Sequence, residues 1–416
     1  MQGLYIHVPF CKSRCVYCDF YSTVRGEEAR KAYAAALANE MRLRSRYFNI
    51  KGSETAAETT CAIGGALTCI KPVLDSIYLG GGTPSVLGEA ELQVVFGAIA
   101  ECFDIAPGAE ITIEANPDDV DEPFAQMLKR LPINRVSMGV QTFSDSQLRL
   151  LRRRHSSLQV EQAIANLRSA DITNLSIDLI YGLPNQTLEQ WRADLDKALA
   201  LPISHLSAYA LIYEEGTELY RMRERGEVSE APDELSLQMF RALMERTEAA
   251  GFNHYEISNF ARPSLEARHN TGYWRGMRYL GLGPGAHSYD GNSRQWNSPD
   301  LSAYLTSQGD VATAGLSERE ILTLAMRKEE TILTQLRTAA GIDLAAYSSQ
   351  YGEAALRQLM AKARPYILDG QLSVEPVAPQ SFVKHPSDGA ENQGRCLCLT
   401  REGVFVSDGI MAELFD

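Results

Sequence analysis

Three cysteines stand within eight residues near the start of the chain. Cys11, Cys15 and Cys18 follow a C-x3-C-x2-C spacing. Closely spaced thiolates are typical ligands of zinc and of iron-sulfur clusters. A structural zinc site needs four ligands, and His7 or Asp19 could supply the fourth. A [4Fe-4S] cluster held by three thiolates instead leaves one iron without a protein ligand, so that a small molecule can bind there.

The bulk composition places these thiols in an ordinary soluble protein. The chain has 416 residues, of which 45% are hydrophobic and 22% charged, and no uncharged apolar stretch approaches the roughly 20 residues of a membrane-spanning helix. Eight cysteines are too few for a disulfide scaffold, and the first residues lack a secretory signal pattern. We therefore expect a cytoplasmic protein with reduced thiols. Its net charge of -13 argues against a broad nucleic-acid-binding surface, so no nucleic-acid partner is expected.

Strands and helices alternate in the elements that must position these residues. Six short apolar segments each end in a polar or glycine-rich turn: LDSIYLGGGTP, EITIEANPDD, NRVSMGVQTF, LSIDLIYGLP, HLSAYALIYEEGT and FNHYEISNF. Longer segments of helical periodicity lie between them. Strand followed by helix, repeated about six times, predicts an α/β fold with a parallel sheet or barrel. In such barrels catalytic groups lie at the C-terminal ends of the strands, where these turns fall.

A change in pattern near residue 300 predicts a second domain. Helical segments dominate from there, and Ser317 with Glu320 three residues later predicts a helix start through a capping box. We predict a core domain at 1–295 and a smaller, mainly helical domain at 296–416. Two stretches rich in small or polar residues are predicted to be inserted loops, 49–72 and 376–395. Four further cysteines have no role that the sequence indicates: Cys61, Cys69, Cys396 and Cys398.

The segment IHVPFCKSRCVYCDF resembles the signature loop of the radical S-adenosylmethionine (SAM) enzymes. Its surroundings resemble the branch that contains oxygen-independent coproporphyrinogen III oxidase and the HemW-type heme chaperones, from Tyr5 through the helical C-terminal region. The resemblance implies a partial (β/α)6 TIM-like barrel with a [4Fe-4S] cluster on Cys11, Cys15 and Cys18. In this family the open iron binds the amino and carboxylate groups of SAM, and reduction can cleave SAM to a 5′-deoxyadenosyl radical.

Residues at the predicted strand ends match the SAM site of this family. The glycines of GGGTP would let the backbone approach a ligand closely. Glu114, Gln141 and Asp178 each lie in or just after an apolar strand, where a buried polar side chain needs a partner. A structural network among the three would satisfy that need equally well. The resemblance implies SAM contacts for nine residues, namely Tyr5, Tyr17, Gly81, Gly82, Thr83, Glu114, Gln141, Arg153 and Asp178.

Two departures separate this chain from the oxidases. Their loop typically has a fourth cysteine, which would fall at position 20, where this chain has Phe20. They also carry a longer N-terminal extension, whereas only ten residues precede Cys11 here. Coproporphyrinogen III decarboxylation is therefore not expected.

A second segment favours the chaperone branch. RHNTGYWRG resembles the HNxxYW motif of the HemW-type proteins, which implies heme contacts for His269, Asn270, Tyr273 and Trp274. Imidazole is a good axial ligand of heme iron, and aromatic rings can pack against a porphyrin. The alternative is a histidine satisfied in the core beside two core aromatic residues.

The sequence thus favours a heme chaperone that binds heme and passes it to acceptor hemoproteins, with a [4Fe-4S] cluster and SAM as further cofactors. The alternative is a radical SAM oxidoreductase, including an oxygen-independent coproporphyrinogen III oxidase, so enzymatic activity stays open. Whether the acceptors are respiratory, whether the chain forms a homodimer and whether it touches a membrane peripherally also stay open.

Overall fold

The computed structural model describes residues 1–49, 71–376 and 394–415. The predicted insertions at 49–72 and 376–395 lie almost entirely outside the described residues, and Cys61 and Cys69 lie outside them as well. Within the described ranges the chain forms a large twelve-stranded sheet and a separate three-stranded sheet.

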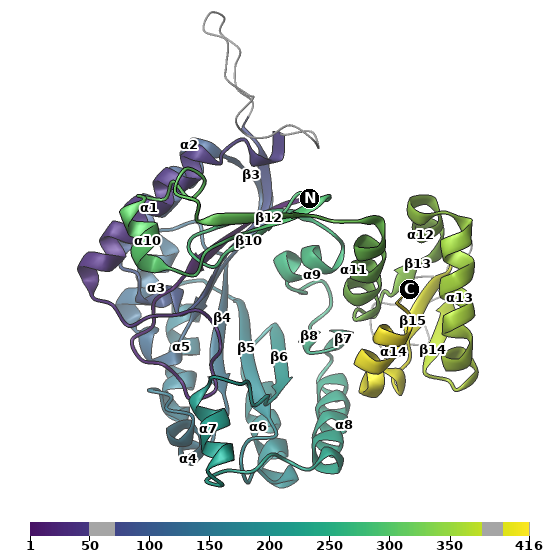
Figure 1. Cartoon of the computed structure of the whole chain (residues 1–416). Coiled ribbons are helices and arrows are strands. Elements are labelled where there is room, and N and C mark those ends of the chain that lie inside the picture. The colour runs from purple at the N-terminus through teal and green to yellow at the C-terminus, as the bar shows by residue number, and fades with distance from the viewer. Residues whose placement is uncertain (50–70, 377–393, 416) are drawn as a thin grey trace, which may run out of the picture.

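The first half of the chain alternates strand and helix, as predicted (Figure 1). The strands are β1 (Gln2–Val8), β2 (Val73–Gly81), β3 (Asp104–Ala115), β4 (Arg135–Gln141), β5 (Asn174–Tyr181) and β6 (His205–Ala210). The helices are α1 (Glu27–Leu43), α2 (Glu89–Cys102), α3 (Glu122–Lys129), α4 (Asp145–Leu150), α5 (Ser157–Ser169) and α6 (Leu188–Ala200). Each strand from β1 to β6 pairs with the next in parallel, which confirms the α/β prediction and the partial (β/α)6 barrel.

Further strands extend both edges of this parallel region. They are β7 (Asn253–Glu256), β8 (Asn259–Ala261), β9 (Arg278–Leu282), β10 (His287–Tyr289), β11 (Ser293–Asn297) and β12 (Ser317–Ile321). The order across the sheet is β12-β11-β10-β9-β1-β2-β3-β4-β5-β6-β8-β7. FNHYEISNF, predicted as one parallel strand, is instead the antiparallel pair β7 and β8. Only two residues join these strands, which is too short for the crossover that a parallel connection requires.

The remaining helices follow β6 or lie near the C-terminus. They are α7 (Glu218–Glu224), α8 (Asp233–Ala249), α9 (Arg268–Trp274), α10 (Leu301–Thr306), α11 (Leu324–Leu336), α12 (Leu344–Tyr351), α13 (Glu353–Leu368) and α14 (Ser407–Glu413). The small sheet has the order β13 (Ile342–Asp343), β15 (Cys396–Leu399), β14 (Leu372–Glu375). Helices α11 to α14 lie together on one side of the barrel, so the C-terminal part is mainly helical, as predicted (Figure 1).

The predicted capping box at Ser317 and Glu320 is wrong. Both residues belong to β12, which pairs antiparallel with β11. The helix begins later, where the Thr323 hydroxyl accepts a hydrogen bond from the Met326 N–H at 3.2 Å. Pairing with a neighbouring strand has overridden the local signal. The division at 295 and 296 stays a prediction, and the large sheet continues through Ile321.

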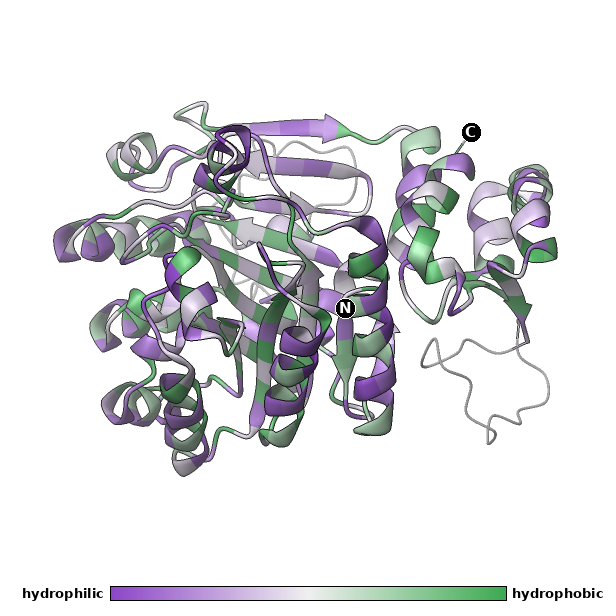
Figure 2. Cartoon of the chain, turned by 90° about the horizontal axis from the view of Figure 1, so that it is seen from below, coloured by the Kyte–Doolittle hydropathy of each residue, from purple (hydrophilic) through white to green (hydrophobic). Residues whose placement is uncertain are grey.

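The two faces of the barrel strands differ in polarity. Leu4 and Ile6 of β1 are fully buried in the main hydrophobic core, together with residues of the surrounding helices. The alternate positions Tyr5 and His7 carry polar groups toward the barrel interior, as the period of two in a strand requires. Figure 2 shows this mixed pattern, with largely hydrophobic strands and helices that are hydrophobic on only part of their surface.

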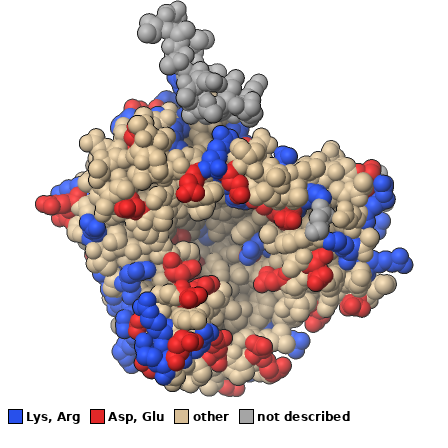
Figure 3. Space-filling model, in the orientation of Figure 1, with Lys and Arg blue, Asp and Glu red and all other residues tan. Residues whose placement is uncertain are grey.

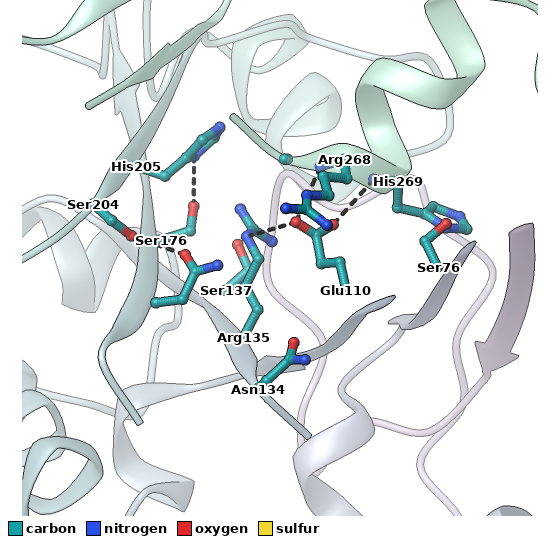
Figure 4. A network of polar contacts seen from close by, with 12 residues as sticks. Ser76, Glu110, Asn134, Arg135, Ser137, Ser176, Ser204, His205, Arg268 and His269 are labelled. Carbon is teal, nitrogen blue, oxygen red and sulfur yellow. Dashed lines mark hydrogen bonds and ion pairs between the residues drawn. The ribbon is translucent and has the colours of Figure 1, made fainter. Parts of the chain in front are cut away.

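A buried polar network fixes helix α9 against strands β3 and β4 (Figure 4). The Glu110 carboxylate accepts hydrogen bonds from the backbone N–H groups of Arg268 and His269, each at 3.0 Å. The fully buried Arg135 guanidinium lies 4.0 Å from the same carboxylate. These contacts satisfy the first free N–H groups of the short helix, and they therefore set its position and orientation.

Among the described residues, the helices are all too short or too polar to span a membrane.

Candidate functional site

The cysteine loop leaves β1 and is closed at its base by backbone hydrogen bonds. Phe10 and Thr23 form an isolated parallel bridge. The Cys11 N–H donates to the Thr23 carbonyl at 3.0 Å, and the Thr23 N–H donates to the Pro9 carbonyl at 2.7 Å. The loop therefore begins and ends at one place, with the three cysteines between.

A second anchor holds the middle of the loop. The Val16 side chain is buried in a small hydrophobic cluster that also contains Leu151 and Leu219. The Val16 N–H donates to the Leu151 carbonyl at 3.3 Å, and its carbonyl accepts from the Leu219 N–H at 2.8 Å. Because Val16 lies between Cys15 and Cys18, this anchor presents the thiols on either side of it.

The three thiols and most of the predicted SAM residues line one cavity of about 470 Å³. Eight of the nine predicted SAM residues line it, namely Tyr17, Gly81, Gly82, Thr83, Glu114, Gln141, Arg153 and Asp178. Tyr17 belongs to the cysteine loop and Arg153 to the segment between α4 and α5, whereas the other six lie in or just after β2 to β5, as expected for a site at the C-terminal ends of parallel strands. Figure 3 shows a hollow near the middle of the face that it draws, with acidic and basic side chains interspersed around the hollow.

Positively polarised groups approach two of the sulfur atoms. The Thr83 hydroxyl donates to Cys11 Sγ at 3.4 Å, and Arg153 Nη1 donates to Cys15 Sγ at 3.5 Å. Burial, followed by the neighbouring sulfurs, raises the pKa of the Cys18 thiol to about 11. A bound cation supplies the charge that lets crowded thiols ionise together. The donor set, with an open cavity beside it, therefore fits an iron-sulfur cluster that leaves one iron accessible.

The zinc alternative requires a fourth ligand close to the thiols. His7 Nδ1 lies 3.1 Å from the Tyr5 hydroxyl, and His7 Nε2 lies 3.0 Å from the Tyr21 carbonyl oxygen. Both ring nitrogens are thus engaged within the protein. Over the described ranges, no group of three His, Cys, Asp or Glu side chains is arranged to hold a single metal ion. The geometry does not offer His7 as the fourth ligand.

The glycines of GGGTP allow β2 to pack against β1 and the start of the cysteine loop. Gly81 has a φ of +107°, and a Cβ there would lie 2.8 Å from the His7 ring. A Cβ on Gly82 would lie 2.7 Å from the Phe10 carbonyl oxygen. The close approach predicted from these glycines therefore occurs within the protein, toward the His7 ring and the Phe10 backbone.

Glu114 and Asp178 are buried carboxylic groups in the barrel. Glu114 accepts hydrogen bonds from the Tyr78 hydroxyl at 2.7 Å and from the Gly81 N–H at 3.2 Å. Burial, with Asp178 adding to it, raises the pKa of Glu114 to about 7. Burial likewise raises the pKa of Asp178 to about 6, although hydrogen bonds from Ser207 and Ser137 oppose the change. Near neutral pH both groups can change their charge in response to a ligand.

The pKa of Glu114 predicts a pH-dependent effect of Glu114→Gln. The folded chain keeps the Glu114 proton up to about pH 7, whereas an unfolded glutamate loses it near 4.5. Folding is therefore favoured below about pH 4.5 by this group, and that contribution is lost as the pH rises through 7. In thermal unfolding of the cluster-free chain, Glu114→Gln should be more stable than wild type at pH 8, by up to about 3 kcal/mol, and by less than about 1 kcal/mol at pH 5.

The exposed Glu101 offers a control for this experiment. It forms an ion pair with Arg42 at 2.9 Å, which keeps its pKa below the ordinary value. Glu101→Gln should therefore shift stability equally at both pH values. Parallel pH profiles for wild type and Glu114→Gln would contradict the raised pKa of Glu114.

Gln141 and Arg153 reach the cavity through irregular backbone. The pairing of β4 with β5 shifts register between Gly139 and Gln141, and Gln141 has a φ of +70°. Such a bulge redirects a side chain, and strained conformations of this kind gather at functional sites. Arg153 Nη2 donates to the Gly139 carbonyl and to Asn116 Oδ1. Asn116 Nδ2 in turn donates to the Thr83 hydroxyl at 3.3 Å.

Asn116 and Tyr209 line the same cavity, although the sequence did not single them out. Asn116 follows Glu114 by two positions, so the period of a strand could have indicated it. Tyr209 belongs to the predicted strand HLSAYA and remains 44% exposed. Tyr5, by contrast, does not line the cavity, and its ring centroid lies 6.3 Å from that of Tyr78.

The histidine of RHNTGYWRG points into the protein. His269 is fully buried, with Nδ1 2.8 Å from the Ser76 hydroxyl and Nε2 2.7 Å from the Tyr273 hydroxyl. Burial, assisted by the Arg135 charge, lowers the pKa of His269 to about 3. The imidazole is therefore neutral and fully hydrogen-bonded. This geometry matches the alternative of a satisfied core histidine, and neither nitrogen is free to bind iron in this conformation.

The aromatic residues of the same segment face a different space. Tyr273 and Trp274 line a second cavity of about 570 Å³ between α9, the strands β9 to β11, and the helices α11 and α12. The Arg337 guanidinium lies 4.3 Å from the centroid of the Trp274 ring. Asn270 is half-buried on α9 and does not line this cavity. The structure therefore divides the four predicted heme residues between the core and a cavity wall.

Comparison with known proteins shows the family of this chain. The model of the radical SAM superfamily matches residues 5–198. Heme chaperone HemW of Bacillus subtilis is 34% identical over 355 residues, which cover 85% of this chain and 87% of that protein. Heme chaperone HemW of a Synechocystis strain is 35% identical over 429 aligned positions, covering 99% of this chain and 95% of that protein.

A solved structure shares the fold. Coproporphyrinogen III oxidase (HemN) of Escherichia coli matches with a TM-score of 0.77 at 21% identity, covering 100% of this chain and 90% of that one. The family model covers the barrel from β1 to α6, and the two relatives align with the chain well beyond it. The chain belongs to the HemW family of the radical SAM superfamily.

Proposed function

We propose that this chain is a cytoplasmic heme chaperone, which binds heme beside α9 and passes it to acceptor hemoproteins. The observation that carries the proposal is the position of Tyr273 and Trp274, which line a cavity of about 570 Å³ apart from the one that contains the thiols. A cavity of this size suits a cofactor. Two relatives that align with most of the chain are named heme chaperones, which supports the same role.

Membership of the radical SAM superfamily implies a [4Fe-4S] cluster and SAM. We assign the cluster to Cys11, Cys15 and Cys18, which line one cavity with the residues predicted to contact SAM. When bound, the cluster supplies an electron and an open coordination position for SAM. In this assignment Thr83 and Arg153 polarise the cysteine sulfurs.

The remaining SAM residues would act by hydrogen bonding and by shape. Glu114 and Asp178 offer buried oxygens as acceptors for ligand hydroxyl or amino groups. Gln141 enters the cavity from the bulge at the end of β4. Tyr5 would act indirectly, because it does not line the cavity and its hydroxyl lies 3.1 Å from His7 Nδ1.

In the heme site we assign direct contact to Tyr273 and Trp274. His269 would position Tyr273, since its Nε2 lies 2.7 Å from the tyrosine hydroxyl. Asn270 stands on the same turn of α9 and outside the cavity wall. The heme iron would then take its ligand from a group other than His269.

Heme titration of the anaerobically reconstituted protein tests the proposed function. The Soret band should saturate at one heme per chain for wild type. Trp274→Ala should weaken binding by about tenfold, because an aromatic contact of the porphyrin is lost. Trp296→Ala is a matched control, since this half-buried tryptophan stacks on His287 and does not line the cavity.

The absence of saturable binding by wild type would count against a heme chaperone. Turnover-dependent 5′-deoxyadenosine, formed together with a converted porphyrinogen, would instead favour the alternative of an oxygen-independent coproporphyrinogen III oxidase. Equal weakening by both tryptophan substitutions would place the heme elsewhere.

A further inference from the structure

The cavity beside α9 is basic, although the chain as a whole is acidic. The net charge of the chain is -13. The charged residues that line this cavity are four arginines and one glutamate, namely Arg275, Arg278, Arg294, Arg327 and Glu330. A concentration of positive charge in one concave site of an acidic protein indicates an anionic ligand.

Three of these arginines keep their charge available. Arg294 Nε pairs with Glu330 at 2.6 Å. Arg278 donates instead to the Phe48 carbonyl at 3.2 Å, and Arg327 Nη1 donates to Asn292 Oδ1 at 3.3 Å. Arg275 is exposed at the end of α9. Within the part of the chain that the structure describes, no carboxylate lies within ion-pair distance of these three guanidinium groups.

Arg327 has unused hydrogen-bonding capacity inside the protein. Its Nε is buried and has no partner among the described residues. A buried donor without a partner costs free energy, and a guanidinium satisfies carboxylates in pairs of hydrogen bonds. Its position on α11, opposite Arg275 and Arg278, brings cations from separate parts of the chain to one cavity.

Aromatic side chains make up much of the rest of the wall. They are Tyr273, Trp274, Tyr279, Tyr289 and Tyr351. Tyr273 and Tyr279 are in contact edge to face, with ring centroids 4.6 Å apart. Such a wall suits a flat, conjugated ligand, and the arginines suit negative charges on its periphery.

We infer that this cavity recognises heme by its propionates, which Arg275, Arg278 and Arg327 bind while the tyrosines and Trp274 pack against the ring. The inference rests on the proposed function and goes further, because it names the groups that are recognised and the residues that recognise them. Heme carries two carboxylates at one edge of a planar ring, so one ligand meets both features of the cavity. Heme release would then require the breaking of several charge-assisted hydrogen bonds at that edge.

The test compares the affinity of the protein for free heme with its affinity for esterified heme. Hemin and hemin dimethyl ester, delivered from the same nonionic detergent, are titrated into full-length wild type and into Arg275→Gln, Arg327→Gln and the double variant. Wild type should prefer hemin to the ester by at least a hundredfold. Each single variant should bind hemin about tenfold more weakly and the double variant about a hundredfold, while the affinity for the ester stays unchanged.

Arg192→Gln is the matched control, because Arg192 is exposed on α6 and lies outside the cavity wall. It removes the same charge and should leave both affinities as in wild type. Retained ester binding by the double variant shows that its cavity is folded. If wild type binds hemin and ester equally and the arginine variants bind like wild type, the inference fails while the heme chaperone stands. If wild type binds neither, the proposed function fails.

Discussion

Replacing Cys15 with serine should remove the iron-sulfur cluster from the protein. A serine hydroxyl is a far poorer ligand of iron than a thiolate, and the proposed cluster site offers only the three thiols that line the cavity. Anaerobic reconstitution should give about four iron and four sulfide per wild-type chain and a small fraction of this for Cys15→Ser. The visible charge-transfer absorption should disappear with them, and retention of SAM on the protein should fall sharply.

The fold should survive this substitution. Val16 and the Phe10–Thr23 bridge hold the loop through backbone hydrogen bonds that do not involve the thiols. The far-ultraviolet circular dichroism of Cys15→Ser should therefore match that of the cluster-free wild type. Cys102→Ala serves as the control, since Cys102 lies in the core at the end of α2 and should leave the cluster intact. Wild-type iron content in Cys15→Ser would overturn the assignment of the cluster.

Replacing His269 with alanine should destabilise the chain by about 3 kcal/mol. The substitution opens a cavity in the interior and leaves the hydroxyls of Ser76 and Tyr273 without their partner. Denaturant unfolding of the heme-free protein measures this loss. In the heme complex, the positions of the absorption bands should stay as in wild type, because the proposed heme site takes its iron ligand from a group other than His269.

Asn270→Ala provides the neighbouring control. Asn270 is half-buried on the same helix, and its truncation should cost less than about 0.5 kcal/mol. An unchanged stability for His269→Ala, together with shifted heme absorption bands, would support the direct heme contact expected from the sequence. The two readouts thus separate a structural histidine from an iron ligand.

The regular alternation of strands and helices made the barrel predictable, whereas the pairing of the later strands could not be predicted. Apolar segments of strand length, separated by helical periodicity, were enough to indicate β2 to β6. FNHYEISNF was read as a further segment of strand length, but its short turn makes it a hairpin. Ser317 and Glu320 have the spacing of a cap, yet they lie in β12 because β11 pairs with them. Local signals of a few residues cannot report such partners.

The residues of the thiol cavity were largely predictable because the family resemblance named them, and most of them stand at strand ends, which meet at one side of a parallel sheet. The direction of a side chain was harder to predict. Gln141 reaches the cavity through a bulge with positive φ, and His269 turns away from the face that carries Trp274. The basic cavity was not foreseen, since its arginines are scattered from 275 to 327 and only the tertiary fold gathers them.

The preformed cysteine loop has a consequence for maturation of the protein. Because its base and its middle are fixed by backbone hydrogen bonds and by the burial of Val16, the loop can take its shape during folding. Folding and metal insertion are then separate events, in contrast to small domains that stay unfolded until metal binds. In the proposed cluster site, the supply of iron and sulfide, and not folding, would then set when the cluster forms.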